Sequence, residues 1–187
     1  MILSDAQITR SIDSGDLVIE PFSSQLVRPA SVCLRLAGEY ITMESHNPID
    51  IRDPDTYPVN RTMVAPHGDG IMINPGETVL GSTIERISFS RRLAGRVENL
   101  SGLARLGLQV VLSGYVSPGF GEAEPSTLTL EMACFQRSPI IIYPGMRICH
   151  LVIWRLDEPA LHGYDSQVGN YSHLNGPAPS HFFTDFQ

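Results

Sequence analysis

Residues 99–132 begin with Asn99-Leu-Ser-Gly-Leu-Ala-Arg-Leu-Gly-Leu108 and end with Thr127-Leu-Thr-Leu-Glu-Met132. The backbone N–H groups of a small-residue turn such as Ser101-Gly102 can bind phosphate oxygens, and a nearby Arg105 can add charge-assisted hydrogen bonds. Glu131 stands in an otherwise apolar and Thr-rich strand, where a carboxylate is costly to desolvate unless something uses it. The stretch therefore predicts a site where a phosphorylated small molecule meets a lone acid or base.

Length and charge limit the classes of protein that the chain can belong to. Its 187 residues are enough for one well-packed domain and too few for two comfortable ones. The net charge of −7 argues against general binding to a nucleic-acid backbone, which needs a basic face. A charged fraction of 18% is below the average of roughly 25%, which is compatible with surface buried against other subunits.

The sequence also predicts a protein without a membrane anchor. No stretch approaches the ~20 apolar residues of a membrane span, and Met1–Arg10 lacks the basic-then-apolar layout of a signal peptide. The 3 cysteines are odd in number and unclustered, which favours buried, reduced thiols in a cytoplasmic protein. Neither they nor the 6 histidines show ligand spacing, so the sequence predicts no protein-held metal site.

Turn signals organise the chain into short strands. Asn74-Pro75-Gly76, Ser117-Pro118-Gly119 and Tyr143-Pro144-Gly145 each separate short apolar runs, and Pro-Gly suits the centre of a type II turn. Strands recurring between such turns predict a mainly β fold, an antiparallel sandwich or distorted jelly-roll barrel.

Only one or two short helices are expected. Ser4 caps an amphipathic segment that ends near Gly15, and Ser101 is expected to cap a short helix around residues 100–106. Residues 45–70 are rich in Pro, Asp, Asn and Gly and are expected to form a long loop. Residues 164–187 have the composition of a tail that packs on another part of the structure.

Several blocks in order resemble the dCTP deaminase branch of the dUTPase-like family. They are Ser101-Gly-Leu-Ala-Arg-Leu-Gly-Leu, Val116-Ser-Pro-Gly-Phe, Leu128-Thr-Leu-Glu-Met and Ile142-Tyr-Pro-Gly-Met-Arg-Ile, with Arg28-Pro-Ala-Ser-Val-Cys-Leu-Arg-Leu before them and Gly169-Asn-Tyr-Ser-His-Leu-Asn-Gly in the tail. The resemblance covers nearly the whole chain, and the order of the blocks is more specific than any single block.

The resemblance implies a homotrimer of distorted β-barrels, with sites between subunits that bind a deoxynucleoside triphosphate. It also implies Mg²⁺ bound through the nucleotide phosphates. Residues 1–163 would form the dUTPase-like β domain, and residues 164–187 would form a tail that closes over the site or a neighbouring subunit.

The expected reaction is hydrolytic deamination of dCTP to dUTP without zinc, because the His-x-Glu and Pro-Cys-x-x-Cys signature of zinc deaminases is absent. By the resemblance, Glu131 is the general base and acid, Arg105 a catalytic cation that also touches phosphate, and Ser101 a catalytic and phosphate-binding residue. The nucleotide-binding set that it implies is Ser101, Gly102, Leu103, Ala104, Arg105, Ser117, Thr129, Leu130, Glu131, Tyr164, Tyr171 and Gly176.

The chain also departs from the family pattern. Asn99-Leu100 replaces a usual Gly-Arg, which removes one phosphate-binding cation, and Ser117 replaces a usual Asp. The segment between Leu108 and Pro118 is one residue shorter than in the deaminase pattern. The other departures are Cys33 for Asp, Asn170 for Lys, Leu174 for Gln, His181 for Arg and an insertion at residues 121–126.

These departures leave two further functions open. One is a dUTPase-like nucleotide pyrophosphatase, and the other is a catalytically silent, nucleotide-binding trimer. A purely structural role is open for single residues as well: Glu131 could pair with Arg96 or Arg147, and Arg105 could serve in a structural ion pair.

Overall fold

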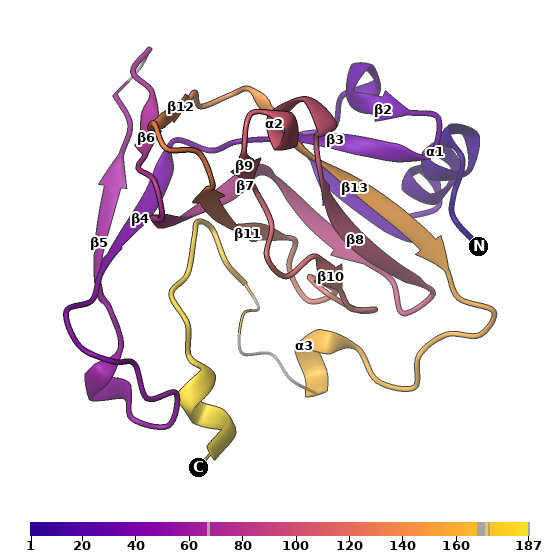
Figure 1. The fold of residues 1–187 in the computed structure, drawn as a ribbon. Coiled ribbons are helices and arrows are strands. Elements are labelled where there is room, and N and C mark those ends of the chain that lie inside the picture. The colour runs from indigo at the N-terminus through magenta and orange to yellow at the C-terminus, as the bar shows by residue number, and fades with distance from the viewer. Residues whose placement is uncertain (67, 168–170, 172, 187) are drawn as a thin grey trace.

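The chain consists mainly of β-strands, as predicted from its turn signals. The computed structural model describes residues 1–66, 68–167, 171 and 173–186, and Figure 1 shows its course. The strands are β1 (Leu17–Glu20), β2 (Val27–Arg28), β3 (Ser31–Arg35), β4 (Glu39–Glu44), β5 (Val59–Val64), β6 (Ile71–Ile73), β7 (Thr78–Phe89), β8 (Leu93–Asn99), β9 (Leu108–Gln109), β10 (Tyr115–Val116), β11 (Ser126–Cys134), β12 (Ile140–Ile142) and β13 (Arg147–Arg155). The helices are α1 (Asp5–Asp13), α2 (Ser101–Arg105) and α3 (Tyr164–Gln167), with 3₁₀ turns η1 (Ser24–Leu26), η2 (Pro54–Thr56) and η3 (Phe182–Phe186).

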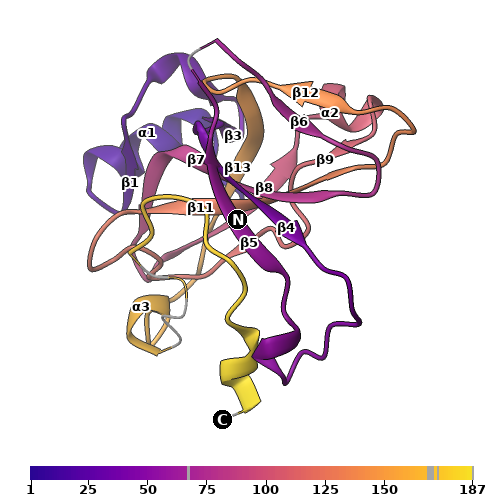
Figure 2. The same ribbon diagram turned by 90° about the vertical axis from the view of Figure 1, so that its left-hand side faces the viewer.

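Two antiparallel sheets enclose the core. One has the strand order β5-β4-β7-β11-β9, with β1 also paired to β7, and the other has the order β10-β8-β13-β3-β2. A small sheet of β6 and β12 lies beside them (Figures 1 and 2). The long strand β7 pairs with β1, β4 and β11, so it organises the first sheet.

The core is mainly apolar, and it also contains the carboxylate of Glu85, which pairs with the partly exposed Arg35. Phe89, Leu130 and Leu151 are fully buried, and burying side chains of this size contributes about 1.5–3 kcal/mol each. Glu85 is also fully buried, and its Oε1 lies 2.6 Å from Arg35 Nε while its Oε2 accepts a 2.8 Å hydrogen bond from the Arg35 N–H. Arg35 thus satisfies both oxygens of a carboxylate that would otherwise be costly to bury.

The expected turns and the first helix are confirmed. Gly76, Gly119 and Gly145 of the three Pro-Gly turns have φ of 74°, 74° and 83°, the left-handed region that glycine tolerates best. The N–H of Ser4 donates a 3.0 Å hydrogen bond to Gln7 Oε1 at the start of α1, and Gly15 follows the helix end with φ of 76°.

The predicted cap of the second helix is wrong by one residue. Leu100 occupies the N-cap position of α2 and makes no side-chain cap, while Ser101 is the first helical residue. Leu100 has extended backbone angles there, so the chain turns into the helix without help from a hydroxyl. Gly107, with φ of 83°, follows the helix as expected.

Residues 45–70 are more ordered than their composition predicts. Residues 59–64 form β5, which pairs with β4 from Glu39↔Val64 to Glu44↔Val59. All six β5 residues are exposed, so the strand shows no alternation of apolar and polar positions that could reveal it in the sequence. We call β4, β5 and the loop between them the arm.

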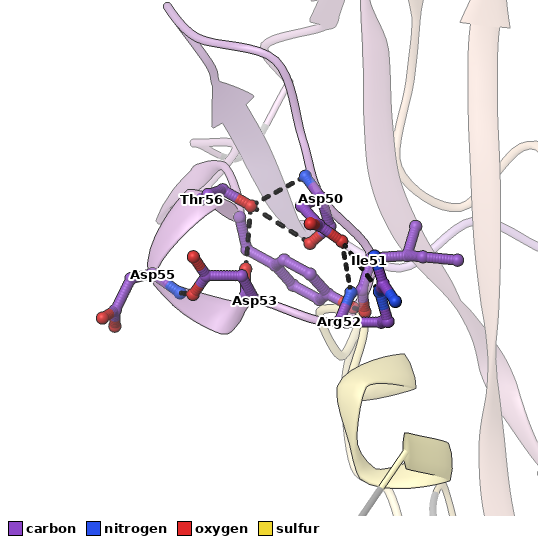
Figure 3. A network of polar contacts seen from close by, with 7 residues as sticks. Asp50, Ile51, Arg52, Asp53, Asp55 and Thr56 are labelled. Carbon is purple, nitrogen blue, oxygen red and sulfur yellow. Dashed lines mark hydrogen bonds and ion pairs between the residues drawn. The ribbon is translucent and has the colours of Figure 1, made fainter.

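The loop at the end of the arm is held by its own polar groups. Thr56 Oγ1 accepts a 2.9 Å hydrogen bond from the Asp50 N–H and donates to the carbonyl of Asp50 or Asp53 (Figure 3). The Tyr57 hydroxyl donates a 2.7 Å hydrogen bond to the Ile51 carbonyl, which fixes the Tyr57 ring at the end of the loop.

The three cysteines, Cys33, Cys134 and Cys149, are buried and unbonded to one another, as expected. Burial, with a smaller effect of Glu85, raises the pKa of the Cys149 thiol well above its ordinary value. No helix in the described part of the chain is both long and apolar enough to cross a membrane.

Candidate functional site

A cavity of about 620 Å³ lies over the β7–β11 face of the first sheet. The tail passes along β11 before it descends to the C-terminus, in both views of the ribbon (Figures 1 and 2). Five of the residues predicted for the site line this cavity: Ser117, Thr129, Glu131, Tyr164 and Tyr171.

Glu131 presents one oxygen to the protein. Its Oε2 accepts hydrogen bonds of 3.2 Å from the N–H groups of Leu112 and Ser113. Within the described part of the chain, Oε1 accepts no hydrogen bond and the carboxylate makes no ion pair; Arg96 pairs with Glu98 instead. The side chain is partly buried at the cavity wall, so its second oxygen is available to a ligand.

The pleat of β11 explains which of its residues reach the cavity. Successive side chains of a strand point to opposite faces, so Thr129 and Glu131 line the cavity while Leu130 between them is fully buried in the core. The side chain of Leu130 therefore does not reach the cavity. The pairing of β11 with β7 shifts between Thr127 and Thr129, and Leu128 also lines the cavity at this irregularity.

Tyr164 anchors the start of the tail beside the Pro118-Gly119 turn. Its N–H donates a 2.9 Å hydrogen bond to the Pro118 carbonyl, and its ring lies 5.7 Å from the ring of Phe120. A Cβ on Gly119 would lie 2.4 Å from Gly163 Cα, so this approach requires glycine at position 119. Burial raises the pKa of the Tyr164 phenol, which keeps its hydroxyl neutral at the cavity wall.

The later tail is tied to β11 by strand hydroxyls. Leu174 N–H donates a 2.7 Å hydrogen bond to Ser126 Oγ, and Gly176 N–H donates a 3.0 Å hydrogen bond to Thr127 Oγ1. The Thr127 N–H donates in turn to the Leu174 carbonyl at 2.9 Å. Gly176 itself does not line the cavity, but it holds the segment that does.

The predicted residues of α2 lie outside this cavity. Ser101, Gly102, Ala104 and Arg105 are exposed, and Leu103 packs against the core. Arg105 makes no hydrogen bond or ion pair with any described residue. Among the described residues, it therefore has no partner for a structural ion pair. The structure thus brings together the predicted residues of β11 and the tail, and it leaves the turn predicted to bind phosphate at the surface.

Residues that depart from the family pattern are spread over the fold. Ser117 and Leu174 line the cavity. Cys33 lies outside it on β3, where its Sγ is 3.7 Å from His150 Nδ1; burial, then Arg28 and Arg147, lower the pKa of that imidazole. Asn170 lies outside the described residues.

Sequence reasoning missed the groups that hold Glu131. The N–H groups of Leu112 and Ser113 belong to the backbone, which leaves no signature in side-chain type. Phe120 and Thr127 were also missed as cavity residues, although Phe120 directly follows the Pro118-Gly119 turn.

The arrangement of His, Cys, Asp and Glu side chains limits how the protein could hold a divalent cation. The described residues contain no group of three or more His, Cys, Asp or Glu side chains that could hold a metal ion. Mg²⁺ commonly keeps water ligands and binds substrate phosphates rather than a protein cage, so this donor set fits Mg²⁺ held mainly by a nucleotide.

Comparisons with known proteins place the chain in a family. A family model described as dCTP deaminase-like matches residues 2–156. The chain is 38% identical to the protein named dCTP deaminase, dUMP-forming, of Parafrankia sp. (strain EAN1pec), over all of this chain and 92% of that protein. It is 39% identical to the protein of the same name from Salinispora tropica, over 96% of this chain and 94% of that protein.

A solved structure supports the fold assignment. The 2'-deoxycytidine 5'-triphosphate deaminase of Agrobacterium tumefaciens superposes with a TM-score of 0.61 at 17% identity, over 81% of this chain. This chain spans 47% of the length of that one. The likeness concerns the fold alone, and it confirms the expected fold class. With the family model covering most of its length and relatives aligning along nearly all of it, this chain belongs to the dCTP deaminase-like family.

Proposed function

We propose that the protein hydrolytically deaminates a deoxycytidine nucleotide, with dCTP as the expected substrate and ammonia as a product. The observation that carries the proposal is Glu131: one carboxylate oxygen accepts hydrogen bonds from two backbone N–H groups, and the other has no partner among the described residues at the cavity wall. Relatives named dCTP deaminase, aligned over nearly the whole chain, support the choice of substrate.

In the proposed reaction, Glu131 moves protons during attack of water on C4 of the cytosine ring. One proton of the water passes through Glu131 Oε1 to N3, and the other passes from the C4 hydroxyl to the exocyclic amine. The C4–N bond then breaks, ammonia leaves, and a C4 carbonyl remains. The carboxylate is regenerated, so the whole step consumes one water and needs no oxidant or reductant.

The proposal includes a homotrimer with sites shared between subunits. Ser101, Gly102 and Arg105 are exposed and lie outside the cavity that contains Glu131, so in one chain the phosphate-binding group and the acid do not line the same cavity. A neighbouring subunit could supply its α2 to the open side of the cavity. Mg²⁺ bound to the phosphates would offset their negative charge in such a site.

Residues 1–163 are proposed as the catalytic β domain and residues 164–187 as its closing tail. The contacts of Tyr164, Leu174 and Gly176 with the cavity wall support this division. Three buried cysteines without a disulfide suit a reducing compartment, so we propose a cytoplasmic location.

One specific observation favours a second activity at the same site. The relatives are named dUMP-forming, so their named product carries one phosphate, whereas deamination alone would leave the triphosphate. Cleavage of the triphosphate to dUMP and pyrophosphate is therefore the second candidate, either coupled to deamination or alone.

The test is a product assay on a panel of deoxynucleoside triphosphates with Mg²⁺, in which ammonia and pyrophosphate are both measured. The wild-type protein is expected to release ammonia from dCTP, and Glu131→Gln is expected to lower kcat at least about a hundredfold. Glutamine keeps an oxygen that can accept from Leu112 and Ser113, so the fold should be retained.

Two results would contradict the deaminase proposal, and a third would contradict the role of Glu131 in it. Pyrophosphate without ammonia would identify a pyrophosphatase, and neither product would identify a nucleotide-binding relative without activity. Full ammonia release by Glu131→Gln would remove that carboxylate from the reaction.

A further inference from the structure

We propose that Asn99 and Gln109 are positioning residues that hold the segment 110–113, and through its N–H groups hold Glu131 in the orientation for proton transfer. This inference rests on the proposed function, because it assigns a role in a reaction that Glu131 carries out. It adds two residues that have no place among the predicted site residues.

The carboxylate depends on this one segment. Both donors to Glu131 Oε2 are N–H groups of consecutive residues, Leu112 and Ser113. Leu112 is 59% exposed, so its side chain does little to hold the segment in place. The position of the two N–H groups must therefore be fixed by the residues on either side.

Two amide side chains fix the segment from its N-terminal side. Asn99 Oδ1 accepts a 2.8 Å hydrogen bond from the Val110 N–H, and Gln109 Nε2 donates a 2.7 Å hydrogen bond to the Val111 carbonyl. The side chains of Val110 and Val111 are buried, and both hydrogen bonds are partly buried.

The C-terminal side is fixed by the same strand that carries Asn99. The Val97 N–H of β8 donates a 2.8 Å hydrogen bond to the Gly114 carbonyl. A Cβ on Gly114 would lie 2.5 Å from the Val97 carbonyl oxygen, so the segment and β8 are in close contact here. Strand β8 thus holds both ends of the segment that holds Glu131.

The position of Asn99 is one at which the family pattern led us to expect glycine. A glycine has no side chain with which to accept the Val110 N–H.

The two amides have opposite hydrogen-bonding roles, which allows a matched test. Asn99 acts through its oxygen as an acceptor, and a carboxylate at this position keeps that function. Gln109 acts through its nitrogen as a donor, and a carboxylate there loses it and places an acceptor against the Val111 carbonyl. Asn99→Asp and Gln109→Glu introduce the same charge but should behave differently.

Steady-state ammonia release from dCTP is measured for the wild type, Asn99→Asp, Asn99→Leu and Gln109→Glu in the full-length protein. We expect kcat to fall at least about tenfold in Asn99→Leu and Gln109→Glu, because small displacements of a catalytic group are costly. We expect Asn99→Asp to stay within about threefold of the wild type. KM should change little in all three, since the bonds act on Glu131 rather than on the nucleotide.

Amide hydrogen exchange of residues 110–113 is measured on the same proteins. Exchange should accelerate in Asn99→Leu and Gln109→Glu and stay near the wild-type rate in Asn99→Asp. Equal losses of kcat in Asn99→Asp and Gln109→Glu would overturn the proposal, as would a change confined to KM. Faster exchange with unchanged kcat would also overturn it, because the segment would then be held without consequence for Glu131.

The two proposals fail separately. A wild-type protein that releases no ammonia from dCTP contradicts the proposed function, and the role in proton transfer falls with it. The exchange rates still decide whether Asn99 and Gln109 hold the segment. If the wild type is active and Glu131→Gln is inactive, the proposed function is supported. The variants at Asn99 and Gln109 can still contradict the positioning role in that case.

Discussion

Helix α2 and strand β11 both carry residues predicted for one site, yet they meet different surroundings. Glu131 and Thr129 of β11 line a cavity covered by the chain's own tail, whereas Ser101 and Arg105 of α2 are exposed. Arg105 has no hydrogen bond or ion pair to any described residue, in contrast to Arg35, which is committed to the buried Glu85. An exposed cation without a protein partner is available to another molecule.

The difference teaches that the proposed catalytic acid and the residues proposed to bind phosphate lie apart within one chain. On the β11 side, one chain supplies both the N–H groups that bind Glu131 and tail residues that line the cavity. On the α2 side, Ser101, Gly102 and Arg105 are exposed and do not line that cavity. The proposed trimer joins the two by placing α2 of one subunit at the cavity of the next.

The largest effect is expected when two variants are combined in one oligomer. This experiment tests whether Arg105 and Glu131 of one site belong to different subunits. Arg105→Ala alone should lower kcat/KM by about ten- to a hundredfold, because a charge-assisted contact contributes about 1.5–3 kcal/mol. Glu131→Gln alone should also be nearly inactive. In a cyclic trimer with shared sites, co-expression of the two variants in equal amounts should restore about a quarter of the sites. A restored site takes its acid from an Arg105→Ala subunit and its cation from a Glu131→Gln subunit.

The control for this mixture is a pair of variants on the same side. Co-expressed Glu131→Gln and Glu131→Ala should recover nothing, because every site then lacks the acid. If Arg105→Ala with Glu131→Gln also recovers nothing while mixed trimers form, the two groups act within one subunit, and the proposed sharing is wrong.

Sequence reasoning succeeded where side-chain type and spacing carry the information. The turn glycines at 76, 119 and 145, the first helix after Ser4, and the placement of Glu131 within a strand were all predicted from pattern. The resemblance of ordered blocks supplied the family and the fold class, which the comparisons confirm.

Sequence reasoning failed where the structure depends on backbone groups or on neighbours distant in the chain. The donors to Glu131 are N–H groups of Leu112 and Ser113, which any residue but proline provides. Strand β5 is exposed along its whole length, so no burial pattern marked it. The exposed position of α2 outside the cavity is likewise not revealed by the spacing of residues within a sequence block.

Removal of the tail tests how much it contributes to nucleotide binding at the cavity beside β11. Deleting residues 171–187 takes away the hydrogen bonds from Leu174, Gly176 and Ala178 to the hydroxyls of Ser126, Thr127 and Thr129. We expect KM for dCTP to rise about tenfold, with a smaller effect on the thermal unfolding midpoint, since the cavity loses a wall and the core keeps its packing. Steady-state kinetics and thermal denaturation measure the two quantities.

Sedimentation of the truncated protein provides the control. If the deletion dissociates the oligomer, the tail is an interface element, and the cover over the cavity is not its main role. An unchanged KM in an intact oligomer would show that the β11 side needs no cover.

The smallest effect is expected at the far end of the tail, where the arm meets it. The Tyr57 ring packs edge-on against Phe183 with 5.9 Å between ring centroids, and the Tyr57 hydroxyl is bonded to the Ile51 carbonyl. Tyr57→Ala should raise KM about threefold, because an aromatic pair contributes about 0.5–1.5 kcal/mol. Tyr57→Phe keeps the ring contact and loses only the hydroxyl, so its KM should stay closer to the wild type. Equal KM in the two variants and the wild type would mean that contacts with β11 alone hold the tail, and that the arm takes no part in closing the site.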